Sequence, residues 1–237
     1  MTQKQRTSFD QFSEDYSNIL DGSISISGES SIFFVELKIK LLREYFQSIY
    51  KSPLKILDYG CGTGRTAHFT RKYFPNSEFF GVDISEKSIE VARKSYPECT
   101  FSVIDPAKGL RGMNFKNKFD IVFSAVVFHH ITPKQRKKTF EQIFATLKNR
   151  GYFVLFEHNP YNPVIRKIVK DCPFDKDAVL MKPEDAQHLF KETNFTVEKQ
   201  IYYFFFPQFF SFLRWCEKFL TNVPLGAQYM IIGRKED

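Results

Sequence analysis

The chain has 237 residues, of which 43% are hydrophobic and 26% charged, and its net charge at pH 7 is +7. This length allows one large domain or two small ones, and the composition is typical of a soluble globular protein. Four widely separated cysteines without a Cys-x-x-Cys pair argue against a zinc site and a disulfide framework, so we expect no metal. The polar start and the lack of a long apolar run predict a cytoplasmic protein.

The first fifty residues predict a helical lead-in. Phe9, Phe12 and Tyr16 recur at helical spacing among turn-rich segments, so one face of a short helix is aromatic. A longer amphipathic helix is expected over residues 32–50, ending before Ser52-Pro53. The short helix has two interpretations, packing onto the domain or covering a ligand site.

Residues 55–66 are the most informative stretch. A buried strand is expected over 54–58. It is followed by glycines at every second position, Gly60, Gly62 and Gly64, and a helix begins near Thr66. Such a turn bends sharply, and it offers bare backbone and a helix N-terminus to an anionic ligand group. A dinucleotide-binding fingerprint needs a third glycine at the position that Arg65 occupies, so this chain does not match it. An NAD-type oxidoreductase is thereby disfavoured, and it stays an alternative together with a turn that binds no ligand.

With Asp58 ending the strand, this run resembles the first motif of class I S-adenosylmethionine (SAM)-dependent methyltransferases. A carboxylate there suits a ligand that carries an ammonium group, as the methionine part of SAM does. The resemblance implies that SAM is the cofactor and S-adenosylhomocysteine the product, and that the 9–16 pattern is a leader helix bringing Tyr16 to the cofactor. The cofactor-binding residues implied at the turn are Asp58, Tyr59, Gly60, Cys61, Gly62 and Gly64.

Strands and helices alternate beyond the turn. Strands are expected over 54–58, 78–82, 101–105, 151–157, 195–206 and 228–234, with another beginning at 119 in a strand and loop reaching 131. Helices are expected over 66–73, 86–95 and 133–147, the last with a C-cap turn at 149–151, and two more lie within 164–193. The resemblance implies an α/β fold over 51–237. It would be a Rossmann-like, seven-stranded, mostly parallel sheet with helices on both faces and an antiparallel C-terminal hairpin.

Further cofactor contacts are expected at the strand ends. Asp83 lies about 20 residues beyond the glycine turn, where a carboxylate accepts from both ribose hydroxyls. Its alternative role is to cap the next helix, for which Ser85 is better placed. Ile84 would lie against the ribose or adenine. In the resembled family, an acidic residue after the third strand accepts from the adenine amino group and its neighbour donates to the ring. Asp105 and Ile104 match these positions, and the alternative for Asp105 is a turn.

The segments 119–122 and 128–131 resemble the fourth motif of small-molecule methyltransferases, and this implies that Ser124 and Ala125 lie at the cofactor. DNA and protein amino-methyltransferases carry an Asn/Asp-Pro-Pro-aromatic run where this chain has residues 124–127, so no nucleic-acid substrate is expected. We expect a small-molecule or lipid- or glycan-linked acceptor. A non-catalytic SAM-binding module is an alternative that the intact glycine and aspartate set argues against.

Methyl transfer is an in-line displacement that gains from alignment and, for a hydroxyl or protonated amine, from a base. His130, Glu157 and His158 are the catalytic candidates, and His130 is preferred because histidine titrates near neutral pH. The alternative is that His130 shapes the pocket or bonds to the backbone.

Residues 207–220 predict an aromatic helix, within an insertion at about 207–224. One face would carry Phe209, Phe212, Leu213, Cys216, Phe219 and Leu220. Such a face can cover the active site, pair two subunits as a homodimer or lie on a membrane. An ordinary packed helix is the alternative.

Overall fold

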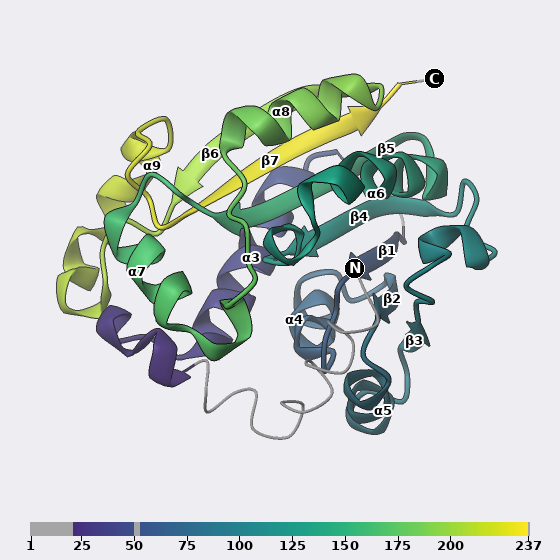
Figure 1. Ribbon diagram of the computed structural model, residues 1–237, viewed down its shortest axis with the longest axis horizontal. Helices are drawn as coiled ribbons and strands as arrows, with labels where there is room; N and C mark the ends of the chain where they lie inside the picture. Colours follow the sequence, from purple (N-terminus) through teal and green to yellow (C-terminus); the bar gives the residue numbers. More distant parts are fainter. Residues whose placement is uncertain (1–20, 50–52, 237) are drawn as a thin grey trace.

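A computed structural model describes residues 21–49 and 53–236, which form a seven-stranded sheet flanked by helices (Figure 1). The strand order is β3-β2-β1-β4-β5-β7-β6. The strands are β1 Lys55–Tyr59, β2 Glu78–Asp83, β3 Thr100–Val103, β4 Phe119–Ala125, β5 Leu147–His158, β6 Phe195–Tyr203 and β7 Gln228–Lys235. Only β7 runs antiparallel to its neighbours, β5 and β6, so the expected fold class is confirmed. The prediction for Tyr16 concerns a residue outside the described part of the chain.

The helices follow the predicted alternation. The α-helices are α3 Ser31–Phe46, α4 Arg65–Tyr73, α5 Glu86–Ser95, α6 Pro133–Thr146, α7 Pro163–Asp171, α8 Pro183–Glu192 and α9 Glu217–Leu220. The 3-10 helices are η1 Ser25–Ser27, η2 Gly109–Gly112, η3 Phe128–His130, η4 Pro173–Asp175 and η5 Gln208–Cys216.

Both faces of the sheet are covered because successive strand side chains point to opposite sides. Ile56, Phe123 and Phe156 pack with apolar residues of α3, α4, α5 and α7. Leu57, Val122 and Leu155 pack on the other side with residues of α6 and α8. These near-continuous apolar strands are what a sheet buried on both faces requires.

Helix α3 belongs to the same core as the sheet. Ser30 caps it by accepting from the Phe33 amide, and its Ile39, Leu42 and Phe46 are buried against β1 and its neighbours. The helix ends at Phe46, short of the predicted residue 50.

The predicted C-cap turn at 149–151 is instead part of β5. Leu147 pairs with Phe119 and Tyr152 with Ile121, so β5 contains an irregularity between these pairs. Arg150 takes a left-handed φ of 63° there. The extra residues are accommodated by a bulge, and the chain enters the strand without leaving the sheet.

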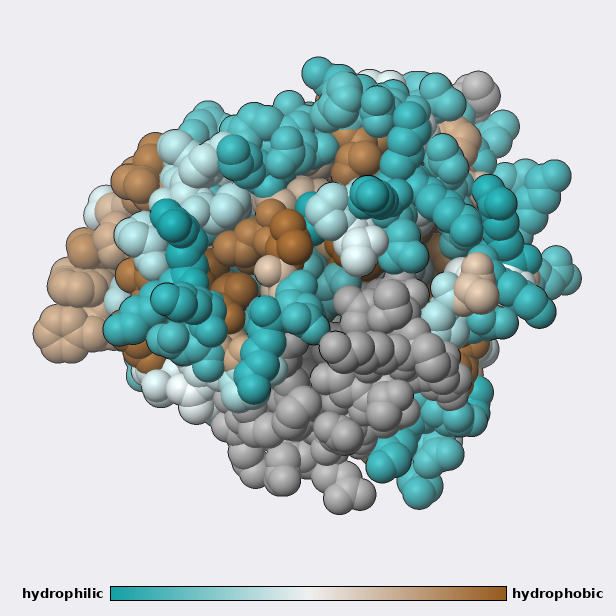
Figure 2. Space-filling model, in the orientation of Figure 1, coloured by the Kyte–Doolittle hydropathy of each residue, from teal (hydrophilic) through white to brown (hydrophobic). Residues whose placement is uncertain are grey.

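The aromatic stretch 207–220 is not one α-helix. It forms η5 and then α9, with a kink at Phe210, and neither helix has a buried residue. Phe209 is 84% exposed and Trp215 67%. Figure 2 shows this apolar surface over η5 and α9 at the left edge. An ordinary packed helix is therefore the wrong interpretation.

Among the described residues, no helix has both the length and the apolar character needed to cross a membrane.

Candidate active site

The glycine turn joins β1 to α4 and forms one wall of a cavity. Gly60 has a φ of 85°, and a Cβ there would lie 2.4 Å from a Val127 methyl carbon, so only glycine fits. Gly62 has a φ of 51°, and a Cβ there would meet no atom within 4 Å because it faces the cavity. Gly64 is required for packing instead, because a Cβ at this position would lie too close to Ala92 and Phe101.

Asp58 ends β1 beneath this turn and lines the cavity, with only 1% of its surface exposed. The Thr66 hydroxyl donates to its Oδ2, whereas its buried Oδ1 has no hydrogen-bond partner among the described residues. Burial raises the pKa of Asp58 to about 7, although the bond from Thr66 lowers it, and Asp83 nearby raises it. A ligand ammonium group would supply both the missing donor and the compensating charge.

We expect SAM affinity to depend on pH through Asp58. The raised folded-state pKa means that the cofactor-free protein loses stability as pH rises from about 4 to about 7. The SAM ammonium favours the ionised carboxylate, so affinity should rise about tenfold between pH 6 and pH 8. Isothermal titration calorimetry measures this change. Asp58→Asn should bind more weakly and show a flat profile, and an equal pH dependence in that variant would exclude Asp58 as its source.

The carboxylate of Asp83, at the end of β2, is held in place by backbone N–H donors. Its Oδ2 accepts from the Gly62 amide at 2.9 Å, and its Oδ1 accepts from the Ser85 amide at 2.9 Å. Ser85 itself caps α5 by accepting from the Ser88 amide at 3.1 Å. Asp83 is therefore not the helix cap. Asp83 lines a side cavity of about 90 Å³, and a carboxylate there suits a ribose diol.

Ile84 and Ala125 line this side cavity together with Gly60, Gly62 and His130. The structure thus brings the predicted turn, β2 and β4 residues to one edge of the sheet, the carboxyl ends of its parallel strands. Ligands of open α/β sheets bind at this edge.

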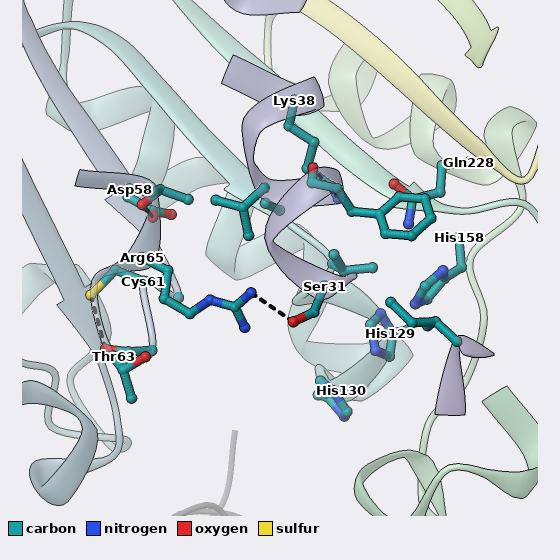
Figure 3. A pocket seen from close by; sticks show the side chains of 18 of the residues that line it. Ser31, Lys38, Asp58, Cys61, Thr63, Arg65, His129, His130, His158 and Gln228 are labelled. Carbon is teal, nitrogen blue, oxygen red and sulfur yellow. Dashed lines mark hydrogen bonds between the residues drawn. The ribbon is translucent and has the colours of Figure 1, made fainter. Parts of the chain in front are cut away.

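The main cavity has a volume of about 190 Å³ and continues from the glycine turn to a histidine cluster. Figure 3 shows Asp58, Cys61 and Arg65 on one side and His129, His130 and His158 on the other. The Arg65 guanidinium donates to the Ser31 hydroxyl at 2.8 Å, which joins α4 to the N-terminus of α3. Helix α3 therefore forms part of the cavity wall.

The sequence analysis missed Lys38, Arg65 and Val126 as cavity residues. Lys38 is 4% exposed, and its burial lowers its pKa to about 7. The charge of Glu157 raises this pKa, and the charge of Arg65 lowers it further. Lys38 and Arg65 both line the cavity, where their side chains can donate to a ligand carboxylate. Val126 has a left-handed φ of 59°, which a β-branched residue rarely adopts. No sequence pattern distinguishes a buried lysine on an amphipathic helix from an exposed one.

Other predicted cofactor residues do not line either cavity. Tyr59 and Ser124 are buried, and the Ser124 hydroxyl donates to the Tyr59 carbonyl at 3.0 Å, which ties β1 to β4. The Ile104 amide donates to the Asp83 carbonyl at 2.8 Å, so it is already paired within the sheet edge. Asp105 is exposed and accepts from the Ala107 amide at 2.8 Å, as in the turn alternative. The adenine contacts stay predictions.

Glu157 lies behind the cavity wall, fully buried. Its carboxylate accepts from the Phe128 amide at 2.7 Å and the His158 amide at 3.2 Å, and it lies 2.9 Å from His129 Nδ1. Burial alone would raise its pKa, but His129 beside it lowers the pKa instead. Because its oxygens are engaged by these groups, we assign Glu157 to positioning the histidines and not to proton transfer.

His130 and His158 reach the cavity as neutral imidazoles. Burial, with His129 as the second cause, lowers the pKa of His130 to about 3 and that of His158 to about 4. A neutral imidazole can accept a proton. The buried Nδ1 of His158 has no hydrogen-bond partner among the described residues.

A second cavity of about 210 Å³ adjoins the first and is mainly apolar. The two share Ile24, Phe34, His158 and Gln228. Most other residues of its wall come from α7 and the segment after β6; they include Ile165, Ile168, Phe204, Phe205 and Pro207. His158 therefore lies where the cavity at the glycine turn meets an apolar one.

The side chain of Asn159 is bonded to the backbone of the segment before β7. Its side-chain amide donates to the Gly226 carbonyl at 2.7 Å and to the Pro224 carbonyl at 3.1 Å. Asn162 Nδ2 donates to the Leu225 carbonyl at 2.7 Å. These asparagines fasten the chain before β7 to the end of β5, which fixes the wall of the apolar cavity.

An open α/β sheet with a glycine turn and a carboxylate on the next strand defines a Rossmann-like nucleotide-binding protein. The chain belongs to the class I SAM-dependent methyltransferases, because a family model described as a methyltransferase domain matches residues 50–204, more than half of it. SAM is the cofactor of this family. The membership also decides against the NAD-type alternative.

Three known proteins illustrate the similarity. Malonyl-(acyl-carrier protein) O-methyltransferase of Halalkalibacterium halodurans is 30% identical over 125 residues, 52% of this chain and 45% of that protein. Cyclopropane-fatty-acyl-phospholipid synthase of Escherichia coli is 28% identical over 120 residues, 51% of this chain and 30% of that protein. The chain thus spans half or less of the length of these relatives. A SAM-dependent methyltransferase from Archaeoglobus fulgidus has the same fold, with a TM-score of 0.68, 18% identity and coverage of 87% of this chain and 95% of that one.

Proposed function

We propose that this protein transfers the methyl group of SAM to an acceptor that carries an apolar chain and is presented at a membrane surface. The observation that carries the proposal is the apolar cavity, whose wall runs from His158 to the exposed Ile26 and Val164 and to Pro207, the residue before the exposed aromatic segment. A relative named for a fatty-acyl-phospholipid adds support for this acceptor class.

The mouth of the apolar cavity lies among exposed apolar side chains. Ile26 and Val164 both line the cavity and are 65% and 46% exposed. Pro207, another lining residue, leads directly into η5. An acyl or isoprenoid chain entering here would place its polar end beside His158 and Gln228, next to the cofactor cavity.

We call the following exposed apolar residues the aromatic surface: Ile26, Val164, Phe209, Phe210, Phe212, Trp215, Phe219 and Leu225. Exposed cations accompany it, namely Arg166, Lys167 and Lys170 on α7 and Lys218 on α9. Aromatic side chains with neighbouring cations favour the interface of an anionic bilayer. This charge pattern favours a membrane over a second copy of the same basic chain as the partner.

His158 is placed to assist the transfer. As the acceptor heteroatom attacks the methyl carbon in line, the carbon–sulfur bond breaks and its electron pair goes to sulfur, which leaves S-adenosylhomocysteine. The proton of an attacking hydroxyl passes to the neutral imidazole of His158, and an ammonium acceptor would give its proton to the same imidazole before its nitrogen attacks. The walls of the cavity align the two substrates, and this alignment lowers the barrier further.

We expect the protein to float with vesicles of phosphatidylcholine and phosphatidylglycerol, and to do so less with phosphatidylcholine alone. Phe209→Ser/Trp215→Ser should lower the partition coefficient at least about tenfold, because two aromatic side chains lose burial worth at least about 2 kcal/mol together. Flotation by density gradient measures this partitioning.

Ile49→Ser is the matched control, because Ile49 is 43% exposed but lies in the turn after α3, where it lines a different cavity. It should float like the wild type. Equal flotation of the double variant, or a wild type that dimerises without lipid and never floats, would contradict membrane binding. A screen of soluble and lipid-linked acceptors with SAM then tests the acceptor class itself.

A further inference from the structure

We propose that His129, His130 and Asp175 bind one divalent transition-metal ion at the acceptor end of the main cavity. All three side chains line this cavity, and their potential ligand atoms lie within 4.8 Å of one another. The catalytic role given to the ion below rests on the proposed methyl transfer, whereas the metal site itself rests on geometry.

The distances suit a shared ion. Asp175 Oδ1 lies 3.3 Å from His129 Nε2 and 3.4 Å from His130 Nε2. These separations are longer than most direct N–H···O hydrogen bonds. Two donors that are each about 2.1 Å from a tetrahedral zinc ion lie about 3.4 Å apart. The observed spacing therefore matches that of neighbouring ligands of one ion.

The ligands are held in place by the surrounding fold. His129 and His130 lie on η3, directly after β4, and Asp175 ends η4. The Val179 amide donates to the His129 carbonyl at 2.8 Å, which joins the chain after η4 to η3. Arg136 holds the backbone of η3, because its Nε donates to the carbonyls of Phe128 at 3.2 Å and Ile131 at 3.0 Å.

Glu157 contacts a proposed metal ligand, His129, at the ring nitrogen that would not bind the ion. Its Oε2 lies 2.9 Å from His129 Nδ1, on the opposite side of the ring from Asp175. Metal-binding histidines commonly donate their other ring N–H to a carboxylate, which sets the tautomer and the ring orientation. This arrangement leaves His129 Nε2 as the metal-binding nitrogen and accounts for a fully buried glutamate that does not reach the cavity.

Three protein ligands leave at least one coordination position for a substrate. Two imidazoles and one carboxylate favour Zn²⁺, Fe²⁺ or a similar ion over Mg²⁺ or Ca²⁺. An acceptor hydroxyl on the ion would lose its proton more readily. His158, whose ring centroid is 5.2 Å from that of His129, is close enough to receive the proton.

Titration with Co²⁺ tests the site, because the visible absorption of this ion reports its ligands and geometry. Protein stripped with EDTA and desalted should bind one Co²⁺ per chain. His130→Ala and Asp175→Asn should each weaken binding more than about 100-fold, beyond the effect typical of losing a second-shell partner. The exposed His188→Ala and Asp177→Asn are matched controls and should bind Co²⁺ like the wild type.

The thermal shift produced by SAM is recorded for each variant. A retained shift shows that the fold and the cofactor site are intact, so a lost Co²⁺ spectrum then reports the metal site alone. Absence of a Co²⁺ spectrum in the wild type, or an unchanged spectrum in both ligand variants, would overturn the proposal and leave a direct ion pair of Asp175 with the histidines. If one ligand variant fails to fold, the other decides. Flotation and acceptor screening test the proposed function separately.

Discussion

Replacing Gly62 by valine is expected to abolish the stabilisation of this protein by SAM. A ligand at 100 times its dissociation constant stabilises a protein by about 2.7 kcal/mol, which for a chain of this size raises the melting temperature by roughly 5–10 °C. A valine side chain at this position would project into the cavity, because the space beyond a Cβ there is open for 4 Å. Differential scanning fluorimetry with and without SAM measures the shift.

The same substitution should leave the fold intact. The left-handed φ of 51° at position 62 imposes a backbone strain of about 1–3 kcal/mol on valine, but its Cβ meets no atom within 4 Å. Gly22→Val is the matched control, since its Cβ also meets no atom within 4 Å. It should keep the full shift. Asp83→Ala should lose the shift as Gly62→Val does, and a normal shift in either variant would refute the placement of the cofactor.

Replacing His158 by glutamine is expected to lower kcat roughly 10²–10⁴-fold, the usual contribution of a general base. The SAM thermal shift should not change, because His158 lies on the opposite side of the cavity from Asp58 (Figure 3). The rate is measured as S-adenosylhomocysteine released with the acceptor found by screening. A loss in kcat with an unchanged affinity for SAM separates proton transfer from cofactor binding.

His68→Gln is the control for this experiment, because His68 is exposed on α4 and should leave kcat unaltered. A His158→Gln enzyme with nearly normal kcat would move the base to His130, the residue that the sequence analysis preferred. The structure favours His158 because this residue lines both the cofactor cavity and the apolar cavity.

Local patterns were sufficient to predict the fold and the cofactor turn. The run of glycines after an apolar strand, with Asp58 before it, requires a backbone that few other sequences can adopt, so its position was evident from residues 54–66 alone. The place of Asp83 was also predictable, because the usual lengths of the helix and strand after the glycine turn fix how far along the chain the second strand ends. The alternating apolar segments then specified a sheet covered on both faces.

Contacts between distant segments were not predictable in this way. Asp175 meets His129 and His130 although more than 40 residues separate them, and no spacing rule covers a gap of this length. The exposure of Phe209 and Trp215 was equally undetermined, because an apolar helical face looks alike in sequence whether it is buried or exposed.

The sequence by itself therefore determined the alternation of strands and helices, the glycine turn and the places of Asp58 and Asp83 at strand ends, since these depend on neighbouring residues and regular periods. The seven-stranded methyltransferase fold was implied by the resemblance of its motifs to those of the family. Only the tertiary structure decided that Lys38 is buried at the cavity, that Glu157 stands behind the histidines, and that an apolar cavity meets His158. Burial and partnership depend on what the rest of the chain packs against each side chain, and local sequence does not contain this information.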